Sequence, residues 1–382
     1  MKKHLAVLFI CVICVCASFT NANDNRFCST FMLHHQDQLI AGHNVDHGHT
    51  LSGLVIINKR NVFKKGKTWK EFSTNEKELS PKPTWTSKYG SVTFNATGYG
   101  LPDGGVNEAG LFIWEMTLEG SQFIEDETLP KLFMEAWMQY QLDNHETINQ
   151  VIRSASEIAM DGWDWHFFTA DASGECASIE FIKGRPVIHV GDSMPVTALC
   201  NSQYTQEVKQ LKGYEGFGGD KRLWLSDKHV PRFVQAAKML RDYKLCETDS
   251  IVDYGLRLLE TLERGGTQWS VVCDIKNQHV YFRTASARSI RSFSLDAFDF
   301  SSNTPVKVLD INKAYAGDVS QRFIDYTPEL NREFVAKGLD SLFGKAETSR
   351  MQEIGFIGEG VTKDILIERL TGYPKSWKTE NQ

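Results

Sequence analysis

The stretch Cys28-Ser-Thr-Phe-Met-Leu33, near the amino end of the chain, decides how the rest of the sequence is read. Residues 29–33 favour a β-strand, and similar short runs follow at 38–42 and 54–58 with turns between them. A cysteine therefore opens the first of a series of short strands.

The residues before this stretch read as a secretory leader. Lys2 and Lys3 form a positive region, an apolar run follows over 5–19, and Thr20-Asn-Ala22 offers the small residues that suit a signal peptidase. An apolar run of about fifteen residues is too short for a membrane span, which needs about twenty. The sequence thus predicts a signal peptide over 1–22 and a periplasmic or secreted protein.

The cysteine count indicates an unpaired thiol. The chain has eight cysteines, and removal of a leader containing three of them leaves an odd number. In an exported protein, an odd number leaves at least one thiol without a disulfide partner. Cys28 stands apart because it lies just beyond the predicted cleavage, whereas four others fit buried, inert residues: Cys176, Cys200, Cys246 and Cys273. A lipoprotein anchored through a leader cysteine (Cys11, Cys14 or Cys16) is the alternative.

The position of Cys28 has a chemical consequence. If the short pro-segment over 23–27 is removed, Cys28 gains a free α-amino group with a pKa of about 7.7 to 8.0. That amine can act as general base for the thiol of its own residue. Such a site needs no catalytic histidine, only donors for an oxyanion and charges that orient the amine.

Composition narrows the function classes. The chain has 382 residues, a formal charge of −6 and 41% hydrophobic residues, which is ordinary for a globular protein able to bury a large core. The length allows two domains or one large domain with an extension. The acidic balance argues against a nucleic-acid binder. The densest basic run, Lys64-Lys-Gly-Lys67, reads as a solvated loop or strand edge.

Periodicity predicts the fold class. Helical spacing occurs in three segments, the first capped by Thr128 with Pro130 near its first turn. Strands and helices come in runs rather than in strict βαβ alternation, which favours a layered α+β architecture. The expected helices cover 129–140, 233–240 and 251–262; the further expected strands cover 91–95, 111–118, 166–170, 177–182, 186–190, 196–200, 268–275, 279–284 and 290–295.

Common hydrolase, nucleotide and metalloprotease motifs (GxSxG, P-loop, HExxH) do not occur in the sequence. Zinc is a rival interpretation, because five histidines fall close together, at 34, 35, 43, 47 and 49. No Cys or Glu partner stands nearby at ligand spacing, so core or solvated histidines are the simpler interpretation. We therefore expect no metal and no cofactor.

Seven segments, taken in order, carry a family resemblance. They are Cys28-Ser-Thr, Ala41-Gly-His-Asn-Val-Asp46, Asp103-Gly-Gly-Val-Asn-Glu-Ala-Gly-Leu111, Trp165-His-Phe-Phe-Thr-Ala-Asp-Ala-Ser-Gly174, Ala198-Leu-Cys-Asn-Ser202, Pro231-Arg-Phe-Val234, and the hairpin from Thr267 to Thr284. Together they resemble the choloylglycine hydrolase family of linear amide C-N hydrolases, which includes bile salt hydrolases and penicillin V acylases, within the N-terminal nucleophile (Ntn) hydrolases. The likeness runs from Cys28 to about Phe300.

The resemblance implies an αββα four-layer sandwich and hydrolysis of a linear amide through an acyl-enzyme. It implies that Cys28 attacks the carbonyl and that Asp46 hydrogen-bonds the freed amine. By the same resemblance Asn201 donates to the oxyanion. Arg232 matches a family arginine, a fixed cation that would lower the pKa of the thiol. The partner is then a small N-acyl amide, and a homo-oligomer is possible by the resemblance.

Two positions depart from the family pattern. His43 stands where the family usually has arginine before Asn-x-Asp, and as a catalytic residue it would make activity depend on pH. Thr117 falls near the place where bile salt hydrolases carry a second oxyanion asparagine, and its hydroxyl could donate one hydrogen bond. Both departures are compatible with an amide hydrolase.

The sequence leaves the substrate open. Phe31, Trp114 and Tyr204 are candidates for an apolar acyl pocket, with core packing as the alternative. An acyltransferase, in which an amine takes the acyl group, shares all chemistry before deacylation. A non-catalytic binding protein on the same fold is a third possibility. We expect one amidase domain over 28–310 and a helical C-terminal extension over 311–382.

Overall fold

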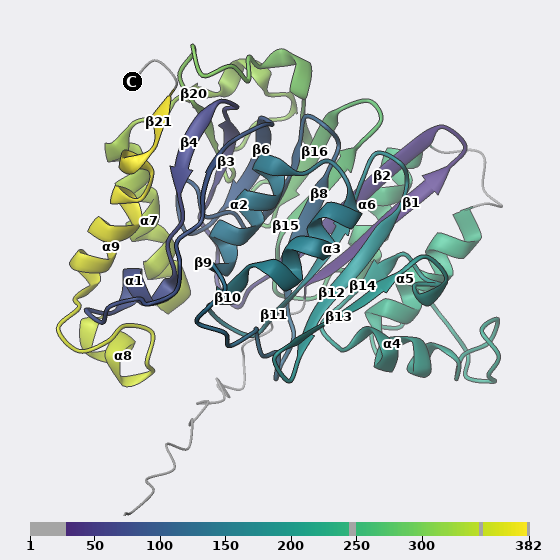
Figure 1. The fold of residues 1–382 in the computed structure, drawn as a ribbon. Helices are drawn as coiled ribbons and strands as arrows, with labels where there is room; N and C mark the ends of the chain where they lie inside the picture. Colours follow the sequence, from purple (N-terminus) through teal and green to yellow (C-terminus); the bar gives the residue numbers. More distant parts are fainter. Residues whose placement is uncertain (1–27, 244–249, 344–346, 380–382) are drawn as a thin grey trace, which may run out of the picture.

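The computed structural model describes residues 28–243, 250–343 and 347–379. The predicted leader, the predicted pro-segment and Cys246 lie outside these residues. Two β-sheets lie face to face in the middle of the molecule, with helices on both outer faces (Figure 1). This arrangement confirms the expected α+β class and the four-layer αββα sandwich.

The first sheet has seven strands and carries the start of the described chain. Its neighbours are antiparallel apart from the last pair, which is parallel. In order across the sheet, the strands are β14 (Ala198–Leu199), β1 (Ser29–His35), β2 (Gln38–Asp46), β15 (Thr267–Asp274), β16 (His279–Thr284), β17 (Arg291–Ser294) and β19 (Gly317–Asp318).

The second sheet has nine strands, all paired antiparallel. In order, they are β13 (Arg185–Val190), β12 (Cys176–Ile182), β11 (Trp165–Ala170), β8 (Phe112–Thr117), β7 (Gly104–Asn107), β6 (Ser91–Asn95), β3 (Leu54–Asn58), β18 (Lys307–Asp310) and β20 (Ile324–Asp325). Two small sheets stand beside it: β9 (Lys131–Phe133) with β10 (Ala159–Asp161), and β21 (Lys378–Thr379) with β4 (Val62–Lys65) and β5 (Thr84–Thr86).

Helices cover the outer faces of both sheets. The seven-stranded sheet packs against α5 (Arg232–Asp242) and α6 (Ile251–Leu262). The nine-stranded sheet packs against α2 (Met134–Asn144) and α3 (Ile148–Glu157). The short α1 (Trp69–Ser73) and α4 (Tyr204–Leu211) lie at the ends of the layers.

Side chains that alternate along the strands fill two separate hydrophobic cores. On β8, Phe112, Trp114 and Met116 belong to the cluster between the sheets, whereas Ile113 points to the other face and joins a second cluster beneath α2. Successive side chains of a strand point to opposite faces, so one strand serves both cores. The space between the sheets is therefore lined from β8 on one side and from β1 and β2 on the other.

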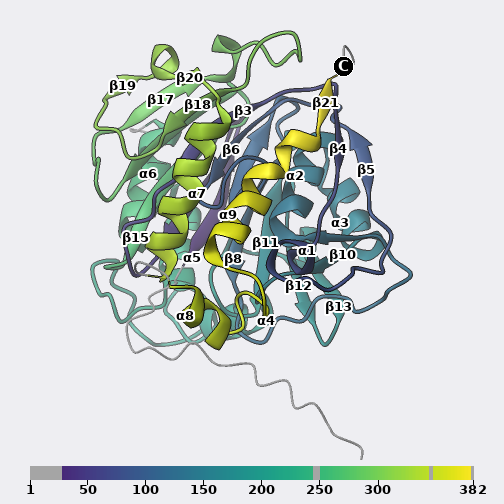
Figure 2. The same cartoon turned by 90° about the vertical axis from the view of Figure 1, so that its left-hand side faces the viewer.

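The chain beyond residue 311 wraps onto the second core. It forms α7 (Pro328–Phe343), α8 (Thr348–Glu353) and α9 (Lys363–Gly372), and Figure 2 shows α7 and α9 side by side on one flank. Strand pairing runs across the predicted boundary at residue 310, because β18 and β20 are neighbours in the same sheet. Within residues 28–243, 250–343 and 347–379, none of the helices combines the length and the apolar character that a membrane span requires.

One predicted helix start is wrong. The sequence predicts a helix from Leu129, but α2 begins at Met134. The intervening Lys131–Phe133 forms β9, which pairs in parallel with β10, and Thr128 bonds to Asp126 instead of capping a helix. Tertiary pairing here overrides a helical spacing of apolar residues.

Candidate active site

Cys28 lies immediately before β1, beside the end of β2. The register of the two strands pairs Ser29 with Asn44, so the chain at Cys28 runs alongside Asp46. Cys28 is only 3% exposed. Burial raises the pKa of its thiol well above the usual value, and the nearby Glu115 and Asp46 carboxylates raise it further. In the chain as described, the thiol is therefore neutral and needs a base to become a nucleophile.

Asp46, the last residue of β2, is a buried acid with two different oxygens. Its Oδ1 accepts a 2.6 Å hydrogen bond from the hydroxyl of Thr267, which faces it across the β2–β15 pair. Its Oδ2 lies 3.5 Å from Nη1 of Arg232 and has no hydrogen-bond donor among the described residues. Burial raises the pKa of Asp46 to about 7, although Arg232 and Thr267 lower it.

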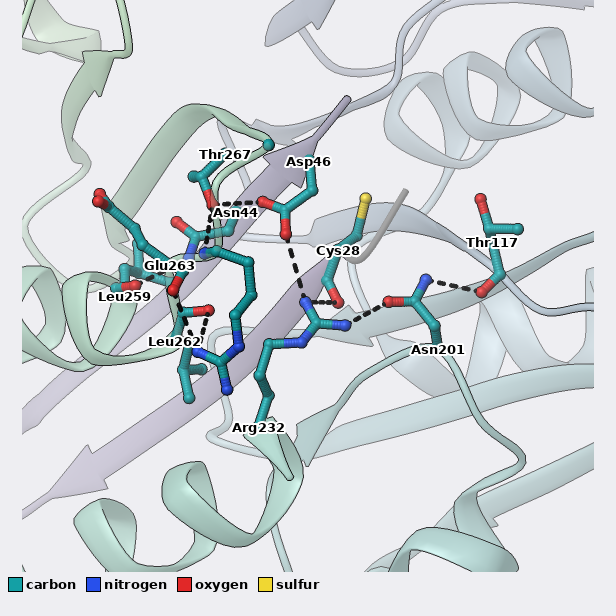
Figure 3. A network of polar contacts seen from close by, with 12 residues as sticks. Cys28, Asn44, Asp46, Thr117, Asn201, Arg232, Leu259, Leu262, Glu263 and Thr267 are labelled. Atoms are coloured by element: carbon teal, nitrogen blue, oxygen red, sulfur yellow. Dashed lines mark hydrogen bonds and ion pairs between the residues drawn. The ribbon is translucent and has the colours of Figure 1, made fainter. Parts of the chain in front are cut away.

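Arg232 connects the parts of the site (Figure 3). It is the first residue of α5 and follows the N-cap residue Pro231. Its guanidinium donates a 2.8 Å hydrogen bond to the carbonyl of Cys28 and a 2.7 Å bond to Oδ1 of Asn201. With Asp46, one planar cation thus contacts three of the predicted site residues. In Figure 3 the Cys28 thiol points away from this guanidinium.

The side-chain amide of Asn201 has a fixed orientation. Its oxygen accepts from Arg232, which can only donate, and its nitrogen donates a 2.7 Å hydrogen bond to the carbonyl of Thr117. The second N–H of the amide makes no further hydrogen bond in the described structure. Asn201 lies two residues beyond the end of β14, and β14 pairs with β1, so the sheet itself brings Asn201 toward Cys28.

Glu207 of α4 holds the backbone on both sides of Asn201. Its two carboxylate oxygens accept hydrogen bonds from the backbone N–H groups of Cys200 at 3.2 Å and Ser202 at 3.4 Å. Glu207 is buried, and burial raises its pKa to about 8. Sequence reasoning missed this residue, because nothing in the spacing shows that the first turn of α4 folds back on the Asn201 loop.

The structure brings Cys28, Asp46, Asn201 and Arg232 together in one network, and Thr117 joins it through its backbone. Thr117 ends β8, and its carbonyl, not its hydroxyl, contacts Asn201. Thr267 was not singled out from the sequence. The feature that could have identified it is its place at the start of the last matching hairpin, where it lies opposite Asp46 in an antiparallel pair.

The other predicted site residues share no hydrogen bond with this network in the described structure. His43 is fully buried and stacks on Trp114, with ring centroids 4.4 Å apart. Burial and the nearby Arg232 charge lower the pKa of His43 well below its usual value, so it is neutral at physiological pH. This contradicts the expectation that a partly charged His43 gives the activity its pH dependence.

Two of the three aromatic pocket candidates fill structural roles in the described chain. Phe31 lies over Gly42 and Gly255, where a Cβ on Gly42 would overlap its ring, so it packs toward α6. The Tyr204 hydroxyl bonds the backbone of Val196. Trp114 differs, because it lies in the space between the sheets.

A hollow of about 420 Å³ has Arg232 in its lining. Lys228, His229 and Arg264 contribute to its lining. Lys228 and Arg264 donate to backbone carbonyls at the C-terminal end of α6, including those of Thr261 and Glu263. These cations thus satisfy helix-end carbonyls and hold α6 against the start of α5.

No group of three or more potential metal ligands occurs within residues 28–243, 250–343 and 347–379. In the predicted histidine cluster, His47 Nδ1 contacts the backbone of His49. The described histidines therefore offer no zinc site.

Comparison with known proteins agrees with this geometry. The family model "Linear amide C-N hydrolases, choloylglycine hydrolase family" matches residues 28–241, more than half of the chain. A penicillin V acylase from Pectobacterium atrosepticum is 27% identical, over 56% of this chain and 69% of its own length.

Two solved structures share the fold. The penicillin V acylase of Agrobacterium tumefaciens is 23% identical, with a TM-score of 0.67 over 79% of this chain and 98% of its own. A conjugated bile acid hydrolase variant of Clostridium perfringens is 15% identical, with a TM-score of 0.59 over 76% and 98%. The chain therefore belongs to the choloylglycine hydrolase family of linear amide C-N hydrolases, and it is a hydrolase of carbon-nitrogen bonds other than peptide bonds.

Proposed function

We propose that the protein is an exported amidase that hydrolyses small N-acyl amides through an acyl-enzyme on Cys28. The proposal requires removal of the residues before Cys28, so that its α-amino group becomes free. The observation that carries it is the arrangement around Arg232, which contacts the carbonyl of Cys28, the amide of Asn201 and the carboxylate of Asp46. All three are groups that a cysteine with a free amine would use.

The acylation step begins with a proton transfer inside Cys28. The α-amine takes the thiol proton, and the sulfur forms a bond to the carbonyl carbon of the substrate. The negative charge that develops on the carbonyl oxygen is stabilised by the remaining N–H of Asn201. The α-ammonium then gives its proton to the leaving amine, and the C–N bond breaks.

Deacylation repeats the sequence with water. The free α-amine takes a proton from a water molecule, the hydroxide attacks the thioester carbon, and the C–S bond breaks as the sulfur recovers a proton. The products are a carboxylic acid and an amine, and no group outside the chain is consumed except water. An amine acceptor in place of water would give acyl transfer by the same route.

The charges of the site suit an amine that cycles between neutral and cationic forms. Oδ2 of Asp46 has no hydrogen-bond donor among the described residues, and an α-ammonium on the adjacent strand would supply one. Arg232 balances that carboxylate when the amine is neutral. The acid therefore always has a positive partner.

The substrates named for the relatives, penicillin V and conjugated bile acids, are small amides of a carboxylic acid. We propose the same general class for this chain: a hydrocarbon-rich acyl group joined to a small amine. The protein's place outside the cytoplasm is part of the proposal, since it rests on the leader over 1–22.

The test is the mass of the purified protein together with its activity. We expect intact-mass and N-terminal analysis to find a chain that begins at Cys28, and an N-acyl amide to be hydrolysed at a measurable rate. Cys28→Ala should abolish hydrolysis. Cys273→Ala, which removes another buried thiol from the same sheet, is the matched control and should retain it. An active protein that still carries Phe27, or an active Cys28→Ala variant, would overturn the mechanism.

A further inference from the structure

Glu180 is a buried acid of the nine-stranded sheet that the proposed chemistry does not use. On β12, the neighbouring Ser178 pairs with Phe168, whose ring belongs to the core between the two sheets. Glu180 is two residues farther along the strand and therefore points to the same face. A carboxylate buried there costs free energy unless the fold supplies partners for it, so its partners indicate its role.

The two carboxylate oxygens of Glu180 have different neighbours. Oε1 accepts a 2.6 Å hydrogen bond from the backbone N–H of Tyr204. Nδ1 of His166 lies 3.6 Å from the same oxygen, and Nε2 of His189 lies 3.8 Å from Oε2. The carboxylate is thus held between imidazoles of the two adjacent strands, β11 and β13, while its hydrogen bond goes to the first residue of α4.

The bond from Tyr204 takes the place of a local cap on α4. The N-cap residue Gln203 makes no side-chain hydrogen bond to the helix, so the first N–H groups need an acceptor from elsewhere. Glu180 supplies one acceptor, and a negative charge suits the N-terminus of a helix. The start of α4 is thereby fixed to the nine-stranded sheet.

Tyr204 also closes the segment that contains Asn201. Its hydroxyl donates a 2.9 Å hydrogen bond to the carbonyl of Val196 and accepts a 3.0 Å bond from the N–H of the same residue. Residues 196–204 therefore form a closed loop, and Glu207 holds the backbone inside it on both sides of Asn201. A force on Tyr204 is passed on to Asn201 through this loop.

Asn201 has to keep its place relative to both sheets. Figure 3 shows it between Arg232 and Thr117, and its amide bonds to the carbonyl of Thr117 at the end of β8, in the nine-stranded sheet. Cys28 precedes β1 of the other sheet. An oxyanion donor works only where the charge develops, and a displacement of about 1 Å can cost about a hundredfold in rate.

We propose that Glu180 is a positioning residue for Asn201, which it holds in register with both sheets through its hydrogen bond to Tyr204 and the closed loop 196–204. The inference rests on the proposed function, in which Asn201 stabilises the oxyanion. It assigns a consequence for the reaction rate to an acid of β12 that acts through α4.

The protein contains a structural counterpart of this contact. Asp161 of β10 also reaches from a strand to a helix start, where its two oxygens accept hydrogen bonds from the N–H groups of Trp69 at 2.7 Å and Lys70 at 2.9 Å. These residues open α1, and neither α1 nor β10 carries a residue of the proposed site. Asp161 is therefore the matched control for a strand acid that caps a helix.

The first test separates the length of the Glu180 side chain from its charge. Glu180→Gln keeps the length and an acceptor oxygen, whereas Glu180→Asp keeps the charge and withdraws the acceptor from Tyr204 by one methylene. On an N-acyl amide that the wild-type protein hydrolyses, we expect kcat of Glu180→Gln to stay within about threefold of wild type. Glu180→Asp should lower kcat about tenfold or more with KM unchanged, because a positioning contact is lost.

The second test separates positioning from helix capping. Gln203→Ser in the Glu180→Asp background gives α4 a local N-cap, but no bond to the nine-stranded sheet. We expect it to return the melting temperature toward that of the wild type and to leave kcat low. Asp161→Ala should lower the melting temperature and leave kcat of the folded protein unchanged.

The outcomes distinguish this inference from the proposed function. Wild-type kcat in Glu180→Asp, equal losses in Glu180→Asp and Glu180→Gln, or recovery of kcat by Gln203→Ser would each overturn the positioning role and leave the proposed function intact. A change confined to KM would also overturn it. Absence of all hydrolysis by the wild-type protein would overturn the proposed function, and the role of Glu180 with it.

Discussion

Two buried acids of this protein are each paired with a cation, but their surroundings differ. Asp143 of α2 is fully buried and pairs with Lys64 of β4, whose Nζ lies 2.8 Å from Oδ2. Trp85 and Gln139 donate to the same carboxylate, at 2.6 Å and 2.9 Å. Both oxygens of this acid are thus satisfied by side chains of the protein.

Asp46 is paired less completely. Arg232 lies 3.5 Å from its Oδ2, which has no hydrogen-bond donor among the described residues. The neighbouring Asn44 Oδ1 and Ser29 Oγ are also buried without partners. The comparison indicates how structural and functional buried charge differ: a structural group is satisfied within the fold, whereas a functional group keeps an atom for the reactant.

Asp46→Asn breaks the functional side of this comparison and gives the largest expected effect on activity. The amide can still accept the Thr267 hydrogen bond, but it cannot hold an α-ammonium by charge. We expect kcat to fall roughly a hundredfold to ten-thousandfold, the contribution of a positioned proton-transfer group. Steady-state kinetics measures the loss of activity, and thermal unfolding measures any loss of stability. A variant that loses stability rather than activity would show that Asp46, like Asp143, has a structural role.

Asp143→Asn breaks the structural side. It leaves the buried Lys64 charge without an anionic partner, and removing one member of a buried pair typically costs about 3–5 kcal/mol. Lys64 also lies 4.4 Å from the ring of Trp377, so the loss should loosen the C-terminal segment. Denaturant unfolding measures the loss, and kcat of the remaining folded protein should stay within about threefold. A fall in kcat as large as that of Asp46→Asn would contradict the distinction between a structural Asp143 and a functional Asp46.

The pH dependence sharpens the same distinction. Burial raises the pKa of Asp46 to about 7 before the amine of Cys28 is freed, and an α-ammonium beside Oδ2 would lower that pKa in the active chain. Since activity needs this acid ionised, kcat/KM should fall about tenfold per pH unit below the pKa of Asp46. The folded-state pKa exceeds the unfolded value of about 3.9, so the native chain binds the extra proton between them. The contribution of Asp46 to the free energy of unfolding should therefore decrease as pH rises through this window.

Asp103 provides the control for this pH experiment. Burial also raises its pKa to about 7, but it bonds to the backbone of Ala96 and lies outside the network. Asp103→Asn should remove a comparable pH dependence of stability and leave the acid limb of activity in place. An acid limb that persists in Asp46→Asn would assign it to another group.

Glu207 extends the comparison to an acid that acts through its neighbours. Glu207→Leu removes both acceptors from the backbone N–H groups of Cys200 and Ser202, so the Asn201 loop should shift. We expect kcat to fall about tenfold with little change in KM, since a positioning group is lost. Glu207→Gln keeps one acceptor oxygen and should restore most of kcat. Equal losses in the two variants would argue against a role in positioning.

The sequence predicts the layers better than it predicts the contacts. The runs over 251–262 and 279–284 match α6 and β16, because apolar periodicity reports directly which face of an element is buried. Helix α3 was missed, although Thr147 and Gln150 form a capping box before its apolar residues. The interpretation of Lys64 as solvated is wrong, since its partner Asp143 is far away in sequence.

The site shows the same limit. Motif matches named Cys28, Asp46, Asn201 and Arg232 as candidates because each stands within a conspicuous segment. Thr267 acts through one hydrogen bond, whose partner depends on strand register, and Glu207 acts through two, which depend on how α4 folds back. Such contacts leave no local pattern, so only the structure reveals them.

Thr117 tests whether a residue aligned with a family position must share its role. Its carbonyl accepts the Asn201 amide, a contact that any residue at this position can supply through the backbone. Thr117→Val removes only the hydroxyl, and we expect kcat to change by less than about threefold. A hydroxyl that donates to the oxyanion would instead cost about a hundredfold to a thousandfold. Because Asn201 is held by the carbonyl, the smaller effect would place oxyanion stabilisation on Asn201 and assign Thr117 to its support.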